Sequence, residues 1–322
     1  MTHIRLTSPQ ARATWLIAVL ILTSGCSLRT YAINQVGDAL ASGNSVYESD
    51  DDLTLVGDAL PFGLKLTESL LAQSPNHRGL LLTACRGFVL YSYAYVDYAA
   101  SVAADDDLDR ARELRARARR LYLRSFQYGL RGLERSYPGI GAPLFADPRT
   151  TVRGIKANRG EDVAFLYWTA ASLGLAISVS PGDAALLARL PEVESLLDRA
   201  LEIDEDWDEG ALHEFKVVLA GAAPGTLDVP LIKKHYDRAV ELSRGKSGSI
   251  HLAYAEAVSV PLQNAVEFHE LIQRALDVNP DDEPGTRLVN LLAQRRARWL
   301  AARADQLFLN DETFVSHERT PR

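Results

Sequence analysis

The chain has 322 residues, a formal net charge of −7 and a hydrophobic share of 47%. Binding to nucleic acid requires a concentrated basic surface, so the acidic balance argues against that class of partner. The hydrophobic share and the absence of low-complexity tracts indicate a globular chain that is long enough for one large domain or two small ones.

The N-terminal segment has the composition of an export signal. Arg5 and Arg12 precede an uninterrupted apolar run over residues 15–22, which is far shorter than the ~18–20 residues that cross a bilayer. Residues 1–25 are therefore expected to be a secretory signal that is removed. Removal would take away two arginines and no acidic residue, so the formal charge would change from −7 to −9.

The residues that follow this run suggest a lipid anchor. The letters "TSGC" before Cys26 resemble the lipobox of bacterial lipoproteins, in which the cysteine carries the lipid, although Thr23 stands where that pattern favours Leu. Ser27 after the cysteine favours the outer membrane over the inner one. A plain signal with an unmodified cysteine is the alternative. Cys85, in the apolar run "LLLTACRGFVLY", is expected to be a small buried hydrophobic residue.

Apolar residues at spacings of three and four recur along the rest of the chain, and alternation with period two is nearly absent, so the sequence predicts an all-α fold. Asp162 and Asp183 are expected to cap helix N-termini, and the "DDD" runs at 50–52 and 105–107 to be caps or surface loops. Helix breaks are expected at the Pro- and Gly-containing stretches 74–79, 137–143, 180–183, 222–225 and 279–285.

Three segments align without gaps, at 196–206, 235–245 and 271–281, each with an Ala before an aliphatic residue; a weaker copy lies near residue 70. Such spacing is typical of tetratricopeptide-like helix pairs and predicts an irregular helical repeat bundle or solenoid with a concave face. The expected organisation is a signal peptide at 1–25, a tether and first helix at 26–48, a tetratricopeptide-like helical domain at 49–310 and a tail at 311–322.

No motif for catalysis or metal binding is complete in the sequence. The acidic stretch 204–210 lacks the Gly and Glu that a calcium loop requires, and a solvated turn is the expected structure. The stretch 245–249 lacks the first Gly of a phosphate loop, and "HEF" at 213–215 lacks a second His. We therefore expect no metal, no cofactor and no catalytic residue; an enzyme acting on cell-wall glycans would need a paired acid and base that the sequence does not offer.

One helical stripe contains an unusual charge. Arg295 shares a face with Leu288, Leu292 and Trp299, and Arg296 is its neighbour. A structural ion pair or a side chain extended over the core is one interpretation. The other is that Arg295 or Arg296 lines a cavity and meets an anionic ligand or a partner carboxylate.

Aromatic residues give a second set of candidates. Tyr91, Tyr95 and Tyr98 fall on one helical face, which indicates core packing or, alternatively, the lining of a pore. Tyr167 and Trp168 are further candidates for a channel lining.

Taken together, the sequence resembles the T-component lipoproteins associated with TRAP transporters, the TatT family. The resemblance is carried by blocks in the same order at 49–82, 116–134, 161–178, 197–215, 253–268 and 290–309. It implies a lipid-anchored, tetratricopeptide-like protein that faces the periplasm and forms a homotrimer with an opening through each protomer. It also implies a partner, the periplasmic substrate-binding protein of a TRAP system, and a small organic-acid or partly hydrophobic ligand.

The expected function is thus a non-catalytic accessory component of solute uptake, anchored through Cys26. Its candidate ligand or pore residues are Tyr167, Trp168, Arg295, Arg296 and Trp299. A general scaffold for protein–protein interaction in the cell envelope is the alternative.

Overall fold

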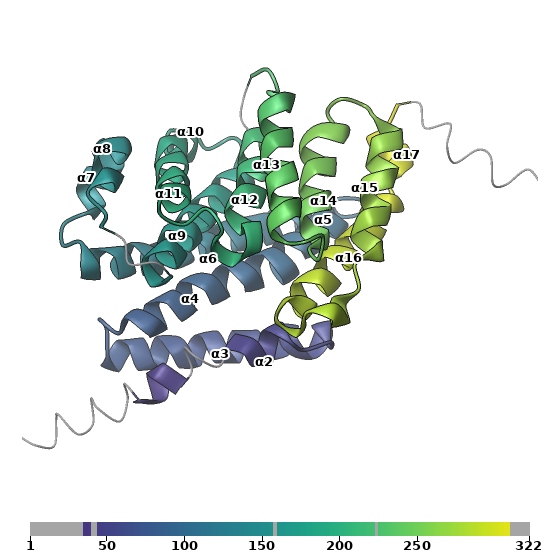
Figure 1. Ribbon diagram of the computed structural model, residues 1–322. Helices are drawn as coiled ribbons and strands as arrows, with labels where there is room; N and C mark the ends of the chain where they lie inside the picture. The colour runs from purple at the N-terminus through teal and green to yellow at the C-terminus, as the bar shows by residue number, and fades with distance from the viewer. Residues whose placement is uncertain (1–34, 40–43, 157–159, 223–224, 310–322) are drawn as a thin grey trace, which may run out of the picture.

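A computed structural model describes residues 35–39, 44–156, 160–222 and 225–309. These residues contain helices and no strand (Figure 1), so the predicted all-α class is confirmed for the described part of the chain. The predicted signal peptide, Cys26 and the C-terminal tail lie outside the described residues.

Six inner helices surround the centre of the molecule. They are α3 (Leu53–Gln73), α4 (Arg78–Tyr91), α9 (Glu161–Ser178), α12 (Ala211–Ala222), α14 (Gly248–Tyr254) and α16 (Arg287–Ala301). Each contacts the next in the order α3, α4, α9, α12, α14, α16, and α16 contacts α3 again. The inner helices therefore form a closed circuit, in which the C-terminal helix α16 lies beside the N-terminal helices (Figure 1).

Outer helices cover this circuit. They are α6 (Leu108–Ser136), α11 (Leu190–Ile203), α13 (Val229–Leu242) and α15 (Ala265–Asp277). Helix α6 packs on α4 and α9, α11 on α9, α13 on α12, and α15 on α14 and α16. The chain thus alternates between an inner and an outer layer over most of its length.

The three aligned segments of the sequence lie on the outer helices α11, α13 and α15. Their small residues Ala200, Ala239 and Ala275 are fully buried. A Cβ placed on Gly210 would lie 3.1 Å from the Ala239 Cα, and one placed on Gly248 would lie 3.0 Å from the Ala275 carbonyl oxygen. At Ala239 and Ala275 the small residue therefore allows a close approach of the neighbouring backbone.

Shorter elements connect these helices. The α-helical ones are α2 (Asn44–Glu48), α5 (Tyr98–Ala103), α7 (Gly141–Ala146), α8 (Pro148–Arg153), α10 (Ala184–Leu187) and α17 (Ala304–Leu307). Two π-helical segments are η1 (Ser92–Asp97) and η3 (Ala255–Ser259), and three 3-10 turns are η2 (Trp207–Gly210), η4 (Pro280–Asp282) and η5 (Pro284–Thr286). Because π-helical turns often occur at functional sites, η1 and η3 are candidate parts of such a site.

Aspartates start several helices as predicted. Asp52, Asp107 and Asp183 lie at the N-caps of α3, α6 and α10, where their carboxylates accept backbone amides of the first turn. This satisfies amides that have no partner within the helix.

The prediction that Asp162 caps a helix is wrong. Gly160, with φ +94°, is the N-cap of α9, and Asp162 lies buried inside the first turn. There its carboxylate accepts hydrogen bonds from Arg78 Nη2 at 2.7 Å and from the Tyr137 hydroxyl at 3.1 Å. A buried carboxylate needs a cationic or hydrogen-bonding partner, and the half-buried Arg78 provides it for Asp162.

The helical run Arg78–Ala103, which comprises α4, η1 and α5, is long and apolar enough to cross a membrane by length and composition alone, but half of its apolar window is buried inside the protein. Cys85 lies fully buried in this run, and burial raises the pKa of its thiol to about 12. The prediction that Cys85 is a buried hydrophobic residue is confirmed.

Candidate functional site

Six polar and aromatic side chains from six elements form a cluster whose charges act on one another. This central cluster consists of Arg86 (α4), Tyr93 (η1), Tyr167 (α9), Asp208 (η2), Glu214 (α12) and Arg296 (α16). The charges of Glu214, Asp208 and Arg86 all act on the pKa of the Tyr167 hydroxyl, and those of Arg296 and Glu214 act on that of Tyr93. Charges affect one another's pKa in this way only when the side chains lie within about a Debye length of one another.

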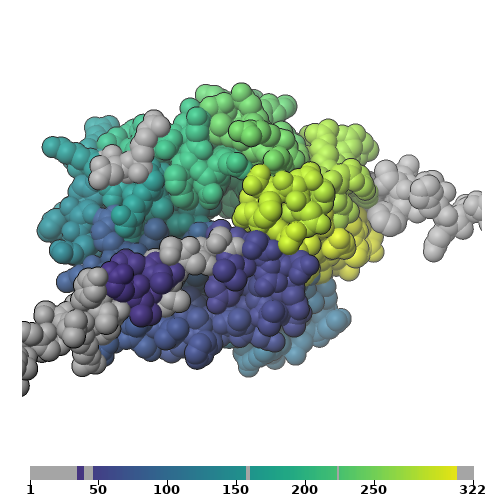
Figure 2. Space-filling view, turned by 60° about the horizontal axis from the view of Figure 1, so that its bottom comes forward, coloured from purple at the N-terminus to yellow at the C-terminus, as the bar shows by residue number. Residues whose placement is uncertain are grey.

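These side chains are accessible to solvent and yet enclosed by protein. Tyr93 is 42% exposed and Asp208 is exposed, whereas Tyr167 and Glu214 are half-buried. Desolvation is nevertheless the largest cause of the raised pKa of all four groups. Exposure combined with desolvation indicates side chains that face an interior space. Figure 2 shows the surface hollowed where the N-terminal, middle and C-terminal helices meet.

Both arginines of the cluster are engaged in ion pairs. Arg86 pairs with Glu48 of α2, and its guanidinium lies 5.5 Å from the ring centre of Trp168. Arg296 donates two hydrogen bonds to Glu256 of η3, from Nη2 to Oε1 at 2.6 Å and from Nε to Oε2 at 3.0 Å. The positive charges at the centre are thus matched by two carboxylates.

Three further carboxylates near the centre have no ion-pair partner among the described residues. Asp97 accepts a hydrogen bond from the Tyr122 hydroxyl at 3.3 Å, and Glu214 accepts one from Ser249 Oγ at 2.9 Å. Asp208 accepts none from the described part of the chain. Burial raises the pKa of all three, that of Glu214 to about 7 with a contribution from the charge of Asp208. Burial thus favours the neutral form of three carboxylates that have no salt-bridging cation among the described residues.

A strained turn presents Asp208 to this space. Asp208 and Glu209 have φ values of +49° and +51°, and Gly210 follows with φ +100°. Left-handed backbone costs an L-residue on the order of 1–2 kcal/mol, and aspartate tolerates it better than most. Such a turn persists only where the surrounding structure holds it in place.

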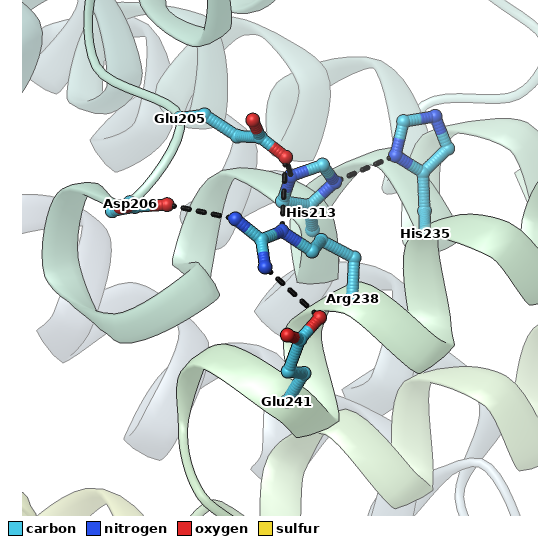
Figure 3. A network of polar contacts seen from close by, with 6 residues as sticks. All are labelled: Glu205, Asp206, His213, His235, Arg238 and Glu241. Atoms are coloured by element: carbon cyan, nitrogen blue, oxygen red, sulfur yellow. Dashed lines mark hydrogen bonds and ion pairs between the residues drawn. The ribbon is translucent and has the colours of Figure 1, made fainter.

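An outer clamp holds the residues that precede the turn (Figure 3). Arg238 of α13 donates hydrogen bonds to Glu205 at 3.0 Å, to Asp206 at 3.0 Å and to Glu241 at 2.9 Å. The guanidinium thereby fastens the segment between α11 and η2 to α13. The contact with Asp206 lies two residues before Asp208 in the chain.

Two histidines extend the clamp. His213 Nε2 lies 3.1 Å from Glu205 Oε1, and His213 Nδ1 lies 2.8 Å from His235 Nδ1 (Figure 3). Because an ionised Glu205 can only accept, His213 donates through Nε2 and accepts from His235 through Nδ1. Burial lowers the pKa of both rings, that of His235 to about 4. Both line an open groove of about 610 Å³ together with Lys233 and Arg238.

The candidate residues predicted from the sequence lie in different surroundings in the structure. Tyr167 and Arg296 belong to the central cluster. Trp168 is only 8% exposed and lies under Arg86. Trp299 is half-buried, with the guanidinium of Arg296 5.9 Å and that of Arg303 4.8 Å from its ring centre.

Arg295 does not join the cluster. Its Nη2 donates to the carbonyl of Ala94, and its guanidinium stacks over Tyr98 at 4.3 Å and Tyr95 at 5.5 Å. Tyr95 in turn donates to the carbonyl of Leu53 at 2.8 Å. Arg295 thus joins α16 to η1, and two tyrosines of the predicted stripe pack between helices rather than around the central space.

Sequence reasoning missed Arg86, Tyr93, Asp208 and Glu214. Asp208 belongs to the acidic stretch that was expected to be a solvated turn; it is an exposed turn, and desolvation nevertheless raises the pKa of this carboxylate. The sequence feature that could have indicated Asp208 is the Gly that ends this run of acidic residues. Among the described residues, no group of three or more His, Cys, Asp or Glu side chains could hold a metal ion.

Comparison with known proteins identifies the family. The family model for the TRAP transporter T-component matches residues 49–308, a range that contains the whole central cluster. A protein of Treponema pallidum (strain Nichols) described as uncharacterized is 31% identical over 310 residues, which cover 91% of this chain and 96% of that protein. The chain belongs to the TRAP transporter T-component family, whose members are accessory components of TRAP-type solute transporters.

Proposed function

We propose that the protein is a non-catalytic, lipid-anchored component of a TRAP-type solute uptake system. It faces the periplasm, docks the substrate-binding protein of that system, and shelters or passes a small organic ligand through its central space. Membership of the family supports the transport role. The single observation that supports ligand passage is the cluster of accessible, desolvated side chains inside a closed circuit of helices.

The closed circuit also supports a route through the protomer. Tyr93 and Asp208 are exposed, and desolvation nevertheless raises the pKa of both. The tetratricopeptide-like character of the helix pairs and the homotrimer remain part of this proposal.

The partner can be tested by recovery from native envelopes. Full-length protein with a C-terminal affinity tag is cross-linked in its own organism, purified in detergent, and analysed by mass spectrometry. Enrichment of a TRAP substrate-binding protein supports the proposal. Recovery of assembly or secretion machinery without any solute-binding protein would favour the envelope scaffold instead.

The anchor has a separate test. Cys26→Ser is compared with Cys85→Ser, because both remove one thiol but Cys85 is buried in the core. Only Cys26→Ser is expected to abolish incorporation of an alkyne fatty acid and release the protein from the membrane fraction. Labelling that survives Cys26→Ser would exclude lipidation at this residue.

A further inference from the structure

The longest helix of the described residues carries a charge opposite to that of the rest of the chain. Helix α6 contains nine arginines and three acidic residues among its 29 residues, which gives it a formal charge of +6. Because the whole chain has a formal charge of −7, the other 293 residues carry −13. Helix α6 is therefore the part of this acidic protein that attracts an anionic surface.

Six arginines form a stripe along the exposed side of α6. Their spacings of seven, three, four, seven and four residues place them on one face of a helix. At 1.5 Å per residue this arginine stripe is about 38 Å long. A solvated helix face usually carries both signs of charge, but between the ends of the stripe the only acidic residues are Glu113 and Glu134. The stripe consists of Arg110, Arg117, Arg120, Arg124, Arg131 and Arg135, all of them exposed.

Most of the stripe has no acidic partner. Arg110 and Arg124 pair with carboxylates, whereas the other four arginines form no ion pair with the described residues. Two of these four donate to uncharged oxygens, Arg117 to a tyrosine hydroxyl at 3.1 Å and Arg131 to a backbone carbonyl at 2.7 Å. Four positive charges on one face thus lack a counter-charge from the described part of the protein.

The stripe ends beside the segment that leads to the predicted anchor. Asp38, in the described residues 35–39, lies 3.3 Å from His77 Nε2 at the loop between α3 and α4 (Figure 1). Arg131 donates to a carbonyl of the same loop. Nine residues lead from Cys26 to residue 35, which span at most about 30 Å. An acyl group on Cys26 would therefore hold this end of α6 close to the bilayer.

On these grounds, and resting on the lipid anchor proposed above, we propose that the arginine stripe of α6 docks on anionic phospholipid headgroups of the membrane that holds the anchor. Guanidinium groups match phosphate oxygens in geometry and charge. Each basic side chain at an anionic bilayer raises the affinity by about fivefold. The helix then lies along the bilayer, and its buried side, which packs on α4 and α9, faces away from the lipid.

The experiment is vesicle flotation of full-length protein carrying Cys26→Ser, so that acyl chains do not mask the contact. Vesicles of phosphatidylcholine alone are compared with vesicles that also contain anionic phosphatidylglycerol. The anionic vesicles are expected to bind more tightly, and added sodium chloride should weaken that binding by screening. Arg120→Gln combined with Arg135→Gln should lower the affinity for anionic vesicles by about twentyfold, because two charges are lost. The affinity for neutral vesicles should not change.

This double variant is suitable because neither Arg120 nor Arg135 makes a hydrogen bond or ion pair with the described residues, so the fold should be preserved. Lys234→Gln combined with Arg244→Gln is the matched control, since it removes two exposed positive charges from α13 and the turn after it. The control should bind both kinds of vesicle as the parent protein does. The N-terminal apolar run is common to all of these proteins, so its contribution cancels in the comparison.

Equal binding to neutral and anionic vesicles, or an equal loss in the control, would overturn the proposal. So would a loss of the substrate-binding protein from the envelope recovery in Arg120→Gln/Arg135→Gln with unchanged vesicle affinity, because it would assign the stripe to an acidic protein surface. Fatty-acid labelling of Cys26 is a separate readout, so failure of the anchor and failure of the stripe are distinguishable.

Discussion

Arg296 of α16 and Glu256 of η3 form a two-point ion pair that connects the last inner helix to a π-helical segment, with hydrogen bonds of 2.6 Å and 3.0 Å. Planar guanidinium and carboxylate groups in this arrangement give both energy and orientation. The ion pair fixes α16 relative to η3 and neutralises Glu256, the only carboxylate of η3.

Removing one partner should therefore cost more than removing both. Arg296→Met is expected to lower the free energy of unfolding by about 1–2 kcal/mol, because the half-buried Glu256 would lose its counter-charge and two charged hydrogen bonds. The double variant with Glu256→Gln should recover part of that loss. Urea unfolding of the two single variants and the double variant measures the coupling, and strictly additive losses would show that the pair contributes nothing.

Arg295 is expected to act on stability rather than on ligand affinity. Arg295→Ala removes a charged hydrogen bond to the Ala94 carbonyl and the stacking on Tyr98, so unfolding should become easier by about 2 kcal/mol. Arg295→Lys should keep only part of the contact, because lysine lacks the planar fork. Thermal unfolding and recovery of the substrate-binding protein with the same variants separate the two roles; a loss of recovery with an unchanged melting temperature would refute the structural one.

The histidine pair should make stability depend on pH. The pKa of His235 falls from 6.5 to about 4 on folding, so the unfolded chain binds a proton that the folded chain does not. The stabilisation is complete above pH 6.5 and is lost as the pH falls towards 4. Desolvation and the charges of His213, Lys216 and Lys234 lower this pKa, whereas Asp198 raises it.

The measurement is the free energy of unfolding of wild type and His235→Gln at several pH values. The difference between them should shrink by about 1 kcal/mol when the pH is lowered from about 7 to about 5.5. The pKa of Glu214 is raised from 4.5 to about 7, so its contribution to stability has the opposite pH dependence and is lost as the pH rises from 4.5 to 7. Because both proteins contain Glu214, this contribution cancels in the difference between them. Parallel curves would refute the assignment.

A glycine at the crossing of α6 and α9 provides a packing test. A Cβ on Gly132 would collide with the fully buried ring of Phe165, whereas a Cβ on Gly87 would meet only the end of the Leu64 side chain at 2.8 Å. Gly132→Ala is expected to destabilise by about 1–3 kcal/mol in spite of the better helix propensity of alanine. Gly87→Ala, the matched control, should lie within about 1 kcal/mol of wild type. Equal effects would show that α9 moves freely relative to α6.

The layered helical fold was largely predictable. Apolar residues at spacings of three and four specify amphipathic helices, and stretches such as 180–183 combine a Pro, a Gly and a capping Asp183. The prediction for Asp162 was wrong because an aspartate can serve either as a helix cap or as an ion-pair partner. Only the position of Arg78, more than eighty residues away, decides between them.

The central cluster was only partly predictable. Its members come from six separate elements, and no local spacing connects Arg86 with Asp208. Tyr93 was missed for a different reason: periodicity analysis assumes a constant 3.6 residues per turn, and η1 is a π-helical segment that turns its side chains relative to α4. Arg296 was found because a charge in an apolar stripe is a local signal.

A contact between the segments that contain the first and the last inner helix limits how this fold can vary. Arg287 Nη1 donates to the carbonyl of Ser49 at 3.0 Å across 238 residues. An open stack of helix pairs can gain or lose one pair and remain a shorter or longer stack. Here an added pair would move α16 away from α2 and α3 and leave a gap in the wall. Insertions and deletions should therefore accumulate in the outer loops, and the number of inner helices should stay constant among relatives that keep the interior space.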